Sequence, residues 1–359
     1  MTLGIDIGTT SVSGVAVDDS GKVAATVTHA HEADIPDLPA GTHAQDPERL
    51  MSATDHVIAE LEAQAGKADR FGWTGQMHGV VGVDRDLRPV TPFVTWRDAR
   101  RFGGRVMAGW AAENRPIAAC LPICGLAIAR RTERLVIDST FLHSWHLEEV
   151  EGKVPQSWLP TLDETSMLGD NQAGVYAARA LFPGCAVVNL GTSGQLSIVE
   201  DVPFHPWSED SLERRPYPDG KTLLCRISLV GGKAFAELRS ELGLTWDEMN
   251  ARAESDERIA RCIRKIVDDL ADGIDLGRAA TLVGVGNALT RNPALRRAVE
   301  QRFGKRCEIP SISEMAAYGA AMYTSLCHPY RRAASTFDGV SSRKSKRSGG
   351  RPIRCAIRS

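Results

Sequence analysis

The sequence lacks long hydrophobic runs, a marked excess of either charge and paired cysteine motifs. No apolar run is long enough to cross a bilayer. Lys plus Arg (43) nearly balance Asp plus Glu (45), which argues against the basic footprint of a nucleic-acid binder. The N-terminus lacks the basic-then-apolar layout of a signal peptide. We therefore expect a cytoplasmic protein that binds neither membranes nor nucleic acids.

The eight cysteines are scattered and form no CxxC pair. Cys120 and Cys124 are near neighbours, but no second pair with the spacing of a zinc site accompanies them. This pattern favours reduced thiols over disulfides or a metal site.

What is present is an ordinary globular composition: 359 residues, 43% hydrophobic and 25% charged. The length suggests two domains of moderate size. The last residues, from Arg331 onward, are basic and Ser-rich, and such a segment cannot bury a core. We expect this tail to be disordered.

The N-terminal stretch LGIDIGTTSVSGV, residues 3–15, predicts two short strands joined by a small, hydroxyl-rich turn. Gly8 lets the backbone approach a ligand or adopt a positive φ. The turn amides, with the hydroxyls of Thr9 and Thr10, offer donors to a phosphate. Asp6, at the end of the first strand, could hold a metal ion through water. An ordinary hairpin with a Thr-rich turn is the alternative.

A third strand is expected at 22–28, followed by an irregular loop at 29–42. Asp46 and Pro47 have the pattern of an N-cap followed by a first-turn proline, and apolar residues then recur at helical spacing over 47–64. Strands followed by a helix are how an α/β nucleotide-binding half would begin.

Two later loops follow apolar strands and carry polar groups. In the first, GQMHG, a lone histidine is often merely structural, but the glycines would let a small polar ligand approach. In the second, TWRD, the indole offers a flat face to a sugar ring, and the charged pair offers directional hydrogen bonds. A surface ion pair beside a half-buried tryptophan is the alternative. The residues concerned are Gln76, Met77, His78, Trp96, Arg97 and Asp98.

The segment 102–164 shows no clean period, and we expect only short elements near 134–143. Its charged residues are interpreted as a solvated face. Order returns at GDNQA, residues 169–173, where a turn enters a small-residue helix. Asp170 lies at its N-terminus, where a carboxylate is stabilised as the anion and could accept a proton from a substrate hydroxyl. Taken by itself, a plain N-cap is the commoner explanation of this residue.

A second strand–turn–strand pattern spans 185–199 and repeats the design of the first, with Gly191, Thr192 and Ser193 in its turn. Two such hairpins suggest two related halves. A loop is then expected at 201–220, strands at 223–230 and 281–284, and helices at 234–242, 252–272, 292–303 and 314–326. Glycines lie before the 234–242 helix and after the 281–284 strand, where a flat ligand such as adenine could approach. These are Gly231, Gly232, Gly284 and Gly286, with Asn287 beside them.

Taken together, DIGTT, GQMHG with TWRD, GDNQA and LGTSG resemble the FGGY carbohydrate kinases over roughly residues 3–322. Within that family the GDNQA and QMHG forms look most like sedoheptulokinase, then xylulokinase. The resemblance implies an α/β, two-domain sugar kinase/actin/Hsp70-like ATPase fold with ribonuclease H-like halves and an interdomain cleft. It also implies a sugar-binding domain at 1–180, a nucleotide-binding domain at 181–328 and a tail at 329–359.

The resemblance further implies ATP and Mg²⁺ as cofactors and a ketose as substrate, in a monomer or homodimer. Asp170 would be the general base for attack of a terminal hydroxyl on the γ-phosphate, with Asp6 near the metal. The two hairpin turns (Gly8, Thr9, Thr10; Gly191, Thr192, Ser193) would hold phosphates. Gly231, Gly232, Gly284, Gly286 and Asn287 would border the adenosine, and the GQMHG and TWRD residues would line the ketose.

Two segments, 110–164 and 240–281, are shorter than the family pattern, and the second lacks its Gly-Thr-Arg stretch. A shortened kinase is therefore expected. A degenerate member that binds ATP or sugar without turnover is the alternative. An actin-like ATPase without a sugar substrate is a third hypothesis, which the polar sugar-facing loops disfavour.

Overall fold

The chain forms two compact units in the computed structural model, which describes residues 1–205, 212–228 and 230–327. The first unit contains residues 1–170 and the chain from Ala316, and the second contains residues 171–315. These limits differ from the expected domain limits at 180 and 328, because the last helix belongs to the first unit. The predicted tail lies outside the described residues.

The first unit is built on a four-stranded sheet with strand order β3-β2-β1-β5. The predicted N-terminal hairpin is present as antiparallel β1 and β2, and β5 runs parallel to β1 on its other side. The strands are β1 (Thr2–Ile7), β2 (Ser11–Val17), β3 (Val23–Ala30) and β5 (Arg70–Gly75).

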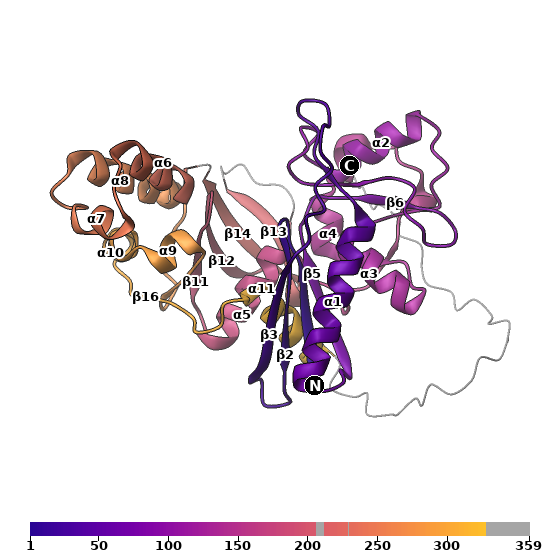
Figure 1. Ribbon diagram of the computed structural model, residues 1–359, viewed down its shortest axis with the longest axis horizontal. Helices are drawn as coiled ribbons and strands as arrows, with labels where there is room; N and C mark the ends of the chain where they lie inside the picture. The colour runs from indigo at the N-terminus through magenta and orange to yellow at the C-terminus, as the bar shows by residue number, and fades with distance from the viewer. Residues whose placement is uncertain (206–211, 229, 328–359) are drawn as a thin grey trace. The chain divides into compact units, whose positions relative to one another are not determined.

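Helices cover both faces of this sheet. Helix α1 (Pro47–Ala65) begins where predicted, because the Asp46 carboxylate accepts a hydrogen bond from the Glu48 amide at 2.8 Å. It packs against β2 and β3 (Figure 1). Helix α11 (Met315–Cys327), predicted at 314–326, covers the opposite face.

Two glycines explain how α11 can lie so close to the sheet. Gly4 and Gly72 are paired on β1 and β5 and so face the same side. A Cβ at Gly4 would lie 1.9 Å from the Ala317 carbonyl oxygen, and one at Gly72 would lie 2.1 Å from that of Ala320. The small residues of the last helix therefore serve close packing on the first sheet.

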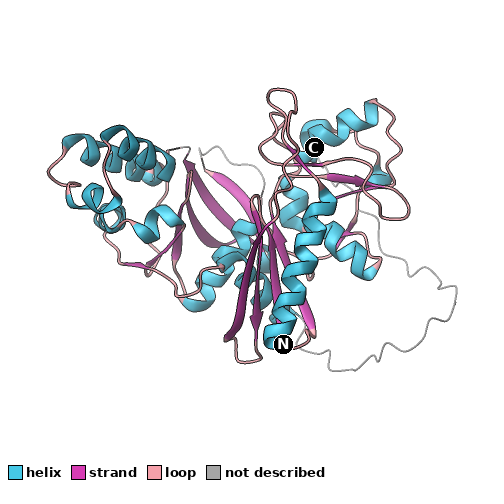
Figure 2. Ribbon diagram, in the orientation of Figure 1, coloured by secondary structure: helices cyan, strands magenta, loops and turns pink. Residues whose placement is uncertain are grey.

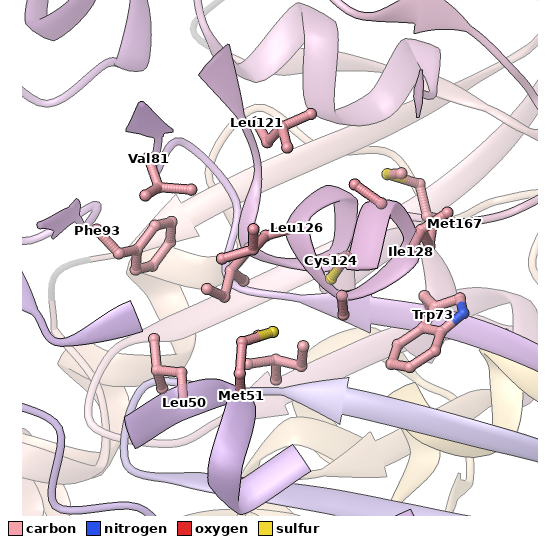
Figure 3. Close-up of a cluster of buried hydrophobic side chains, with 14 of the residues drawn as sticks. Leu50, Met51, Trp73, Val81, Phe93, Leu121, Cys124, Leu126, Ile128 and Met167 are labelled. Atoms are coloured by element: carbon pink, nitrogen blue, oxygen red, sulfur yellow. The ribbon is translucent and has the colours of Figure 1, made fainter. Parts of the chain in front are cut away.

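The segment 102–164 is well ordered, contrary to the expectation of only short elements near 134–143. It contains three helices whose apolar faces join the main core, where Cys124, Leu126 and Ile128 meet Leu50, Met51 and Trp73 (Figure 3). Its elements are α2 (Gly103–Ala112), β8 (Ala119–Leu121), α3 (Ile123–Thr132), β9 (Val136–Ile137), α4 (Ser139–Ser144), η1 (Leu147–Val150), η2 (Gln156–Trp158) and β10 (Thr161–Leu162).

The tryptophans and arginines of this segment have structural partners. Trp110, Trp145 and Trp158 are all buried. The Arg130 guanidinium donates to the Glu48 carboxylate of α1 at 2.9 Å, so the charges do more than form a solvated face. Three short strands complete the unit: β4 (Ala44–Gln45) pairs with β7 (Phe93–Val94), and β6 (Val81–Val83) pairs with β8.

The second unit is built on a six-stranded sheet with order β13-β14-β12-β11-β15-β16. Its strands are β11 (Ala186–Leu190), β12 (Gly194–Pro203), β13 (Glu213–Tyr217), β14 (Lys221–Ser228), β15 (Leu282–Val285) and β16 (Cys307–Glu308), with η3 at Pro218–Gly220. The expected loop at 201–220 is wrong in part. Strand β13 falls inside it, because this segment pairs antiparallel with β14 at the edge of the sheet.

Helices α6 to α10 gather on one side of this sheet (Figure 2). They are α6 (Gly232–Leu242), α7 (Trp246–Ala251), α8 (Glu257–Ala271), α9 (Asn287–Arg291) and α10 (Pro293–Phe303). The helix expected at 252–272 begins instead at Glu257, because the Asp256 carboxylate caps it by accepting from the Arg258 amide at 2.9 Å. Helix α5 (Asp170–Leu181) is the predicted GDNQA helix.

The two sheets share one strand order, as the repeated hairpin design suggested. In the first unit the order β3-β2-β1-β5 joins an antiparallel hairpin to a parallel strand, and β14-β12-β11-β15 does the same in the second. Each unit therefore presents a hairpin turn at the same place in its sheet. Within the described ranges, no helix is long and apolar enough to span a membrane.

Candidate active site

The first hairpin turn, residues 8–10, is held by hydrogen bonds to its carbonyl oxygens. The Gly8 carbonyl accepts from Gln76 Nε2 at 3.0 Å, and it lies 3.3 Å from His31 Nε2. The Thr9 carbonyl accepts from Gln45 Nε2 at 2.8 Å. The Gly8 amide donates to the Ser11 carbonyl at 3.0 Å, so the amides and hydroxyls of Thr9 and Thr10 are the turn groups that could meet an anion.

His31 is a buried part of this support. Its Nδ1 accepts from the Ala33 amide at 3.0 Å, so its Nε2 carries the proton that points at Gly8. Burial lowers the pKa of His31, which favours the neutral ring. Gly8 itself does not have a positive φ, contrary to one of the two roles expected for it. A Cβ there would lie 3.0 Å from the Ser11 carbonyl oxygen.

Of the three predicted site residues in the GQMHG loop, the structure buries two and leaves one partly exposed. Gln76 is 2% exposed and its amide also donates to Gln45 Oε1 at 2.7 Å, so it braces the first turn. Met77 is 4% exposed. His78 has φ +65°, and its Nδ1 lies 2.9 Å from the Ser144 carbonyl oxygen.

The His78 ring belongs to an aromatic group whose other rings come from the segment that sequence patterns described least well. It lies 5.8 Å from the Phe102 ring and 6.2 Å from the His146 ring. His146 in turn lies 5.5 Å from His143. These rings are partly exposed neighbours of the loop predicted to line the sugar.

The TWRD loop reaches the first turn through its tryptophan. Trp96 is 48% exposed, and its indole N–H donates to the Thr9 hydroxyl at 3.0 Å. The Arg97 guanidinium lies 5.5 Å from the centre of the Trp96 ring. The sequence predicted that the TWRD loop and the first turn belong to one site. In the first unit the Trp96 indole indeed lies beside this turn.

Asp98 is occupied within its own loop. Its carboxylate accepts from the Arg100 guanidinium at 2.7 and 2.8 Å and from the His43 amide at 3.2 Å, and it is 3% exposed. Hydrogen bonds from these donors hold the pKa of Asp98 below its usual value although burial opposes them. This geometry assigns Asp98 to holding the loop that presents Trp96.

The predicted base, Asp170, begins α5 next to a buried chain of hydrogen bonds that runs from Gly169 through the Thr140 hydroxyl to Asp138. The Gly169 amide donates to Thr140 Oγ1 at 2.8 Å, and the Thr140 hydroxyl donates to Asp138 Oδ2 at 2.7 Å. Asp138 also caps α4 by accepting from the Phe141 amide at 3.1 Å. Burial raises the pKa of Asp138 to about 7. The turn that carries Asp170 is therefore tied to the core.

Three carboxylates affect the pKa of one buried thiol. Burial raises the pKa of Cys124, and Asp6, Asp170 and Asp138 each raise it further, in that order. In the described part of the chain, no group of three or more His, Cys, Asp or Glu side chains could by itself hold a metal ion. Mg²⁺ commonly takes only one or two protein carboxylates together with phosphate and water. A single ligand such as Asp6 fits that role.

The second hairpin turn, residues 191–193, is tied to the start of α6. The Gly191 carbonyl accepts from the Gly232 amide at 2.9 Å, and the Thr192 carbonyl accepts from the Lys233 amide at 3.1 Å. A Cβ at Gly232 would lie 2.4 Å from the Gly191 carbonyl oxygen. The absence of a side chain at Gly232 therefore lets the helix and the turn lie in contact.

A pocket of about 630 Å³ lies beside this turn, within the second unit. Five predicted nucleotide residues line it: Gly191, Thr192, Gly232, Gly286 and Asn287. Ser193, Gly231 and Gly284 are not among the residues that line it. Gly231 packs against Ser193 instead, and Gly284 packs against Leu289, Cys307 and Ile309.

Sequence reasoning did not identify several residues that the fold brings to these sites. Trp246, Lys233 and Arg291 line the pocket, and Asp138 and Thr140 support the GDNQA turn. For the first group, no pattern in the sequence indicated that Trp246 begins a helix or that it is exposed. The second group lies in the segment without a clean period, so no pattern pointed to it.

The architecture defines the class of protein. Over 92% of this chain and 90% of the other, the structure resembles a ligand-bound xylulose kinase from Lactobacillus acidophilus, with TM-score 0.78 and 16% identity. A gluconate kinase from the same species gives TM-score 0.79 at 16% identity over 92% and 90%. A Plasmodium falciparum glycerol kinase with ADP gives TM-score 0.75 at 16% identity over 90% and 89%. These likenesses confirm the sugar kinase/actin/Hsp70-like fold.

Residues 1–117 match the profile of the FGGY family of carbohydrate kinases, N-terminal domain, so this part of the chain is similar to that domain, as its motifs predicted. Bacillus subtilis (strain 168) gluconokinase is 33% identical over 103 residues, which are 28% of this chain and 20% of that protein. Escherichia coli (strain K12) xylulose kinase is 34% identical over 102 residues, 28% and 21%. The match thus spans about a fifth of the length of these curated relatives.

Proposed function

We propose that this protein transfers the γ-phosphate of ATP to a terminal hydroxyl of a sugar. The observation that carries the proposal is the pocket beside the second hairpin turn. Two main-chain turns of equivalent topology, each rich in hydroxyls, suit a polyphosphate, and the pocket beside one of them suits the nucleoside. Residues 1–117, which match the N-terminal domain of a carbohydrate kinase family, would bind the sugar.

Nucleotide binding would use both turns and the pocket. Gly8, Thr9, Thr10, Gly191, Thr192 and Ser193 would hold phosphates, and Gly232, Gly286 and Asn287 would border the adenosine. Gly231 and Gly284 would contribute by allowing close chain packing behind them. Asp6 would help to hold Mg²⁺, which neutralises phosphate charge when bound.

Sugar binding would use the exposed members of the two loops. His78 and Trp96 present partly exposed rings, and the Arg97 guanidinium lies over the latter. Gln76, Met77 and Asp98 are buried and would support the loops that carry these rings. Sedoheptulose is the favoured ketose, then xylulose, on the likeness of the GDNQA and QMHG forms. The curated relatives named above add gluconate as a substrate to test.

Asp170 would be the general base. It begins α5, and the relay from Gly169 through Thr140 to Asp138 holds its turn in place. A carboxylate held at that position can accept the proton of the attacking hydroxyl. Positioning and charge stabilisation supply most of the rate enhancement in phosphoryl transfer, so a fixed base is what the reaction needs.

The test is an ADP-release assay on the full chain with MgATP and sedoheptulose, xylulose, ribulose, gluconate or glycerol. We expect turnover with one of these and a 10²–10⁴-fold lower kcat for Asp170→Asn, with ATP affinity unchanged within about threefold. Full activity in Asp170→Asn would refute the assignment of the base.

A second candidate function is nucleotide or sugar binding without turnover. The family match ends at residue 117, and two segments are shorter than the family pattern, so the chemistry could have been lost while the pocket was kept. ATP binding without turnover on any sugar would support this candidate. ADP release that is independent of sugar would support the actin-like ATPase hypothesis. Cytoplasmic location and a monomeric or homodimeric state stay predictions.

A further inference from the structure

Trp246 is a large, exposed aromatic side chain that lines the 630 Å³ pocket. It lines the pocket and is 41% exposed, although most tryptophans of the described chain are buried. We propose that the purine base of the nucleotide stacks on the Trp246 ring. This inference rests on the proposed nucleotide-binding function and names the residue that recognises the base.

The chain holds Trp246 at a defined place. It is the first residue of α7, and the residue before it forms a capping box with Glu248. The Thr245 amide donates to the Glu248 carboxylate at 2.8 Å, and the Glu248 amide donates to the Thr245 hydroxyl at 3.2 Å. A capped helix start gives the indole a fixed point of attachment.

A second contact ties α7 to the pocket wall. The Asn250 amide nitrogen donates to the Trp246 carbonyl at 2.9 Å, and it lies 3.3 Å from the amide oxygen of Asn292. Asn292 is itself a pocket residue. The helix that carries Trp246 is therefore tied to a second lining residue of the pocket, which lies outside that helix.

The ring is also supported by its neighbours in α6. The Arg239 guanidinium lies 4.8 Å from the ring centre, and the Phe235 ring lies 6.0 Å away. Arg239 is held in turn by donating to the Leu244 carbonyl at 3.1 Å. A pocket-lining side chain that its neighbours hold and that is still 41% exposed can receive a flat ligand at little cost in side-chain ordering.

The other lining residues indicate a flat ligand with negative charge. Lys233 and Arg291 supply positive charge, and no Asp or Glu is among the lining residues. The glycines leave main-chain groups accessible, and Asn287 offers a side-chain amide. Ala236 and Ala288 add only small side chains to the pocket lining. A nucleotide combines a stacking face with an anionic end, and base–aromatic stacking contributes substantially to such binding.

The test measures ADP and ATP binding by calorimetry on the full chain and on Trp246→Ala and Trp246→Phe. We expect the Kd for both nucleotides to rise about 10–100-fold in the alanine variant and only a few-fold in the phenylalanine variant. The KM for ATP should rise in parallel, with kcat and the KM for sugar unchanged. The preference for ADP over UDP should shrink, because the smaller pyrimidine stacks less.

Asp247→Ala is the matched control, since it alters the next residue of the same helix turn but does not line the pocket. Its nucleotide affinity should equal that of the unaltered protein. Unchanged affinity in Trp246→Ala would overturn the inference and leave the proposed function standing. An unaltered protein that binds no nucleotide would overturn both.

If the alanine variant does not fold, Trp246→Phe decides the matter by fluorescence. We expect ADP to quench the indole emission of the unaltered protein and this change to disappear in the phenylalanine variant while binding persists. A quench of equal size in both proteins would overturn the inference, because another tryptophan would then report the base.

Discussion

At the scale of single residues, Asp138 shows how burial and function are connected. Its side chain is 1% exposed, yet it accepts hydrogen bonds from the Thr140 hydroxyl and the Phe141 amide. Desolvation dominates and raises its pKa to about 7 from 3.8, and the nearby Glu164 carboxylate adds to the rise. The turn before Asp170 thus depends on a group that titrates near neutral pH.

We predict that Asp138 makes the protein less stable as pH rises toward 7. The folded state binds this proton more tightly than the unfolded state, so the stabilisation is complete below about pH 4 and is lost as pH rises through the folded pKa. Relative to Asp138→Asn, which cannot titrate, the free energy of unfolding should fall by up to about 4 kcal/mol over that window. Urea denaturation at several pH values measures it.

Glu164→Gln is the control for this experiment, because burial also raises the pKa of Glu164. That variant should retain the part of the pH dependence that belongs to Asp138. Parallel stability curves for the unaltered protein and Asp138→Asn would contradict the prediction.

At the scale of elements, the contact between α11 and the first sheet depends on the absence of two side chains. Gly4 and Gly72 admit the carbonyl oxygens of Ala317 and Ala320 to distances that any Cβ would forbid. Backbone atoms cannot rotate away as a side chain can, so a methyl group there must displace the helix.

We predict that Gly72→Ala lowers the free energy of unfolding by about 3 kcal/mol, since its Cβ would lie 2.1 Å from the Ala320 carbonyl oxygen. The midpoint of urea denaturation measures the change. Gly109→Ala is the matched control: it lies in α2 with nothing within 4 Å of a built Cβ, and should stabilise the protein by about 1 kcal/mol. Equal midpoints for the two variants would refute the argument.

At the scale of the whole molecule, the second unit is one continuous stretch and the first is not. The chain completes the first sheet, passes through residues 171–315, and returns to supply α11. Each unit has its own hydrophobic core. Only the first therefore needs two separate parts of the chain.

We predict that residues 171–315 expressed alone unfold cooperatively on heating, while residues 1–170 alone form an expanded state that binds a hydrophobic dye. The reason is that the second fragment retains its whole core, whereas the first exposes the face that α11 covers. Co-expression with residues 314–327 should restore compactness. A compact, cooperatively folded 1–170 fragment would show that α11 is dispensable.

Local patterns predicted the elements whose signals are local. The hairpins, α1 with its Asp46 cap, α10 after Asn292 and the last helix were all identified within a few residues. The segment 102–164 was not, because its helices are short and their apolar residues meet partners such as Leu50 and Trp73 far along the chain. Strand β13 was missed for a related reason: it is defined by pairing with β14 and carries Pro216 within it.

The sequence by itself determined the family motifs, the two hairpin turns and the residue types available for phosphoryl transfer, because short-range spacing encodes these. Only the tertiary structure decided which of these residues are exposed to a ligand and which are buried and support the loops. It buried Gln76 in a hydrogen bond to the first turn and Asp98 in hydrogen bonds within its own loop, and it brought Trp246 to the pocket from a separate helix. Hydrogen bonding and close packing between distant segments make that decision, and no local pattern records them.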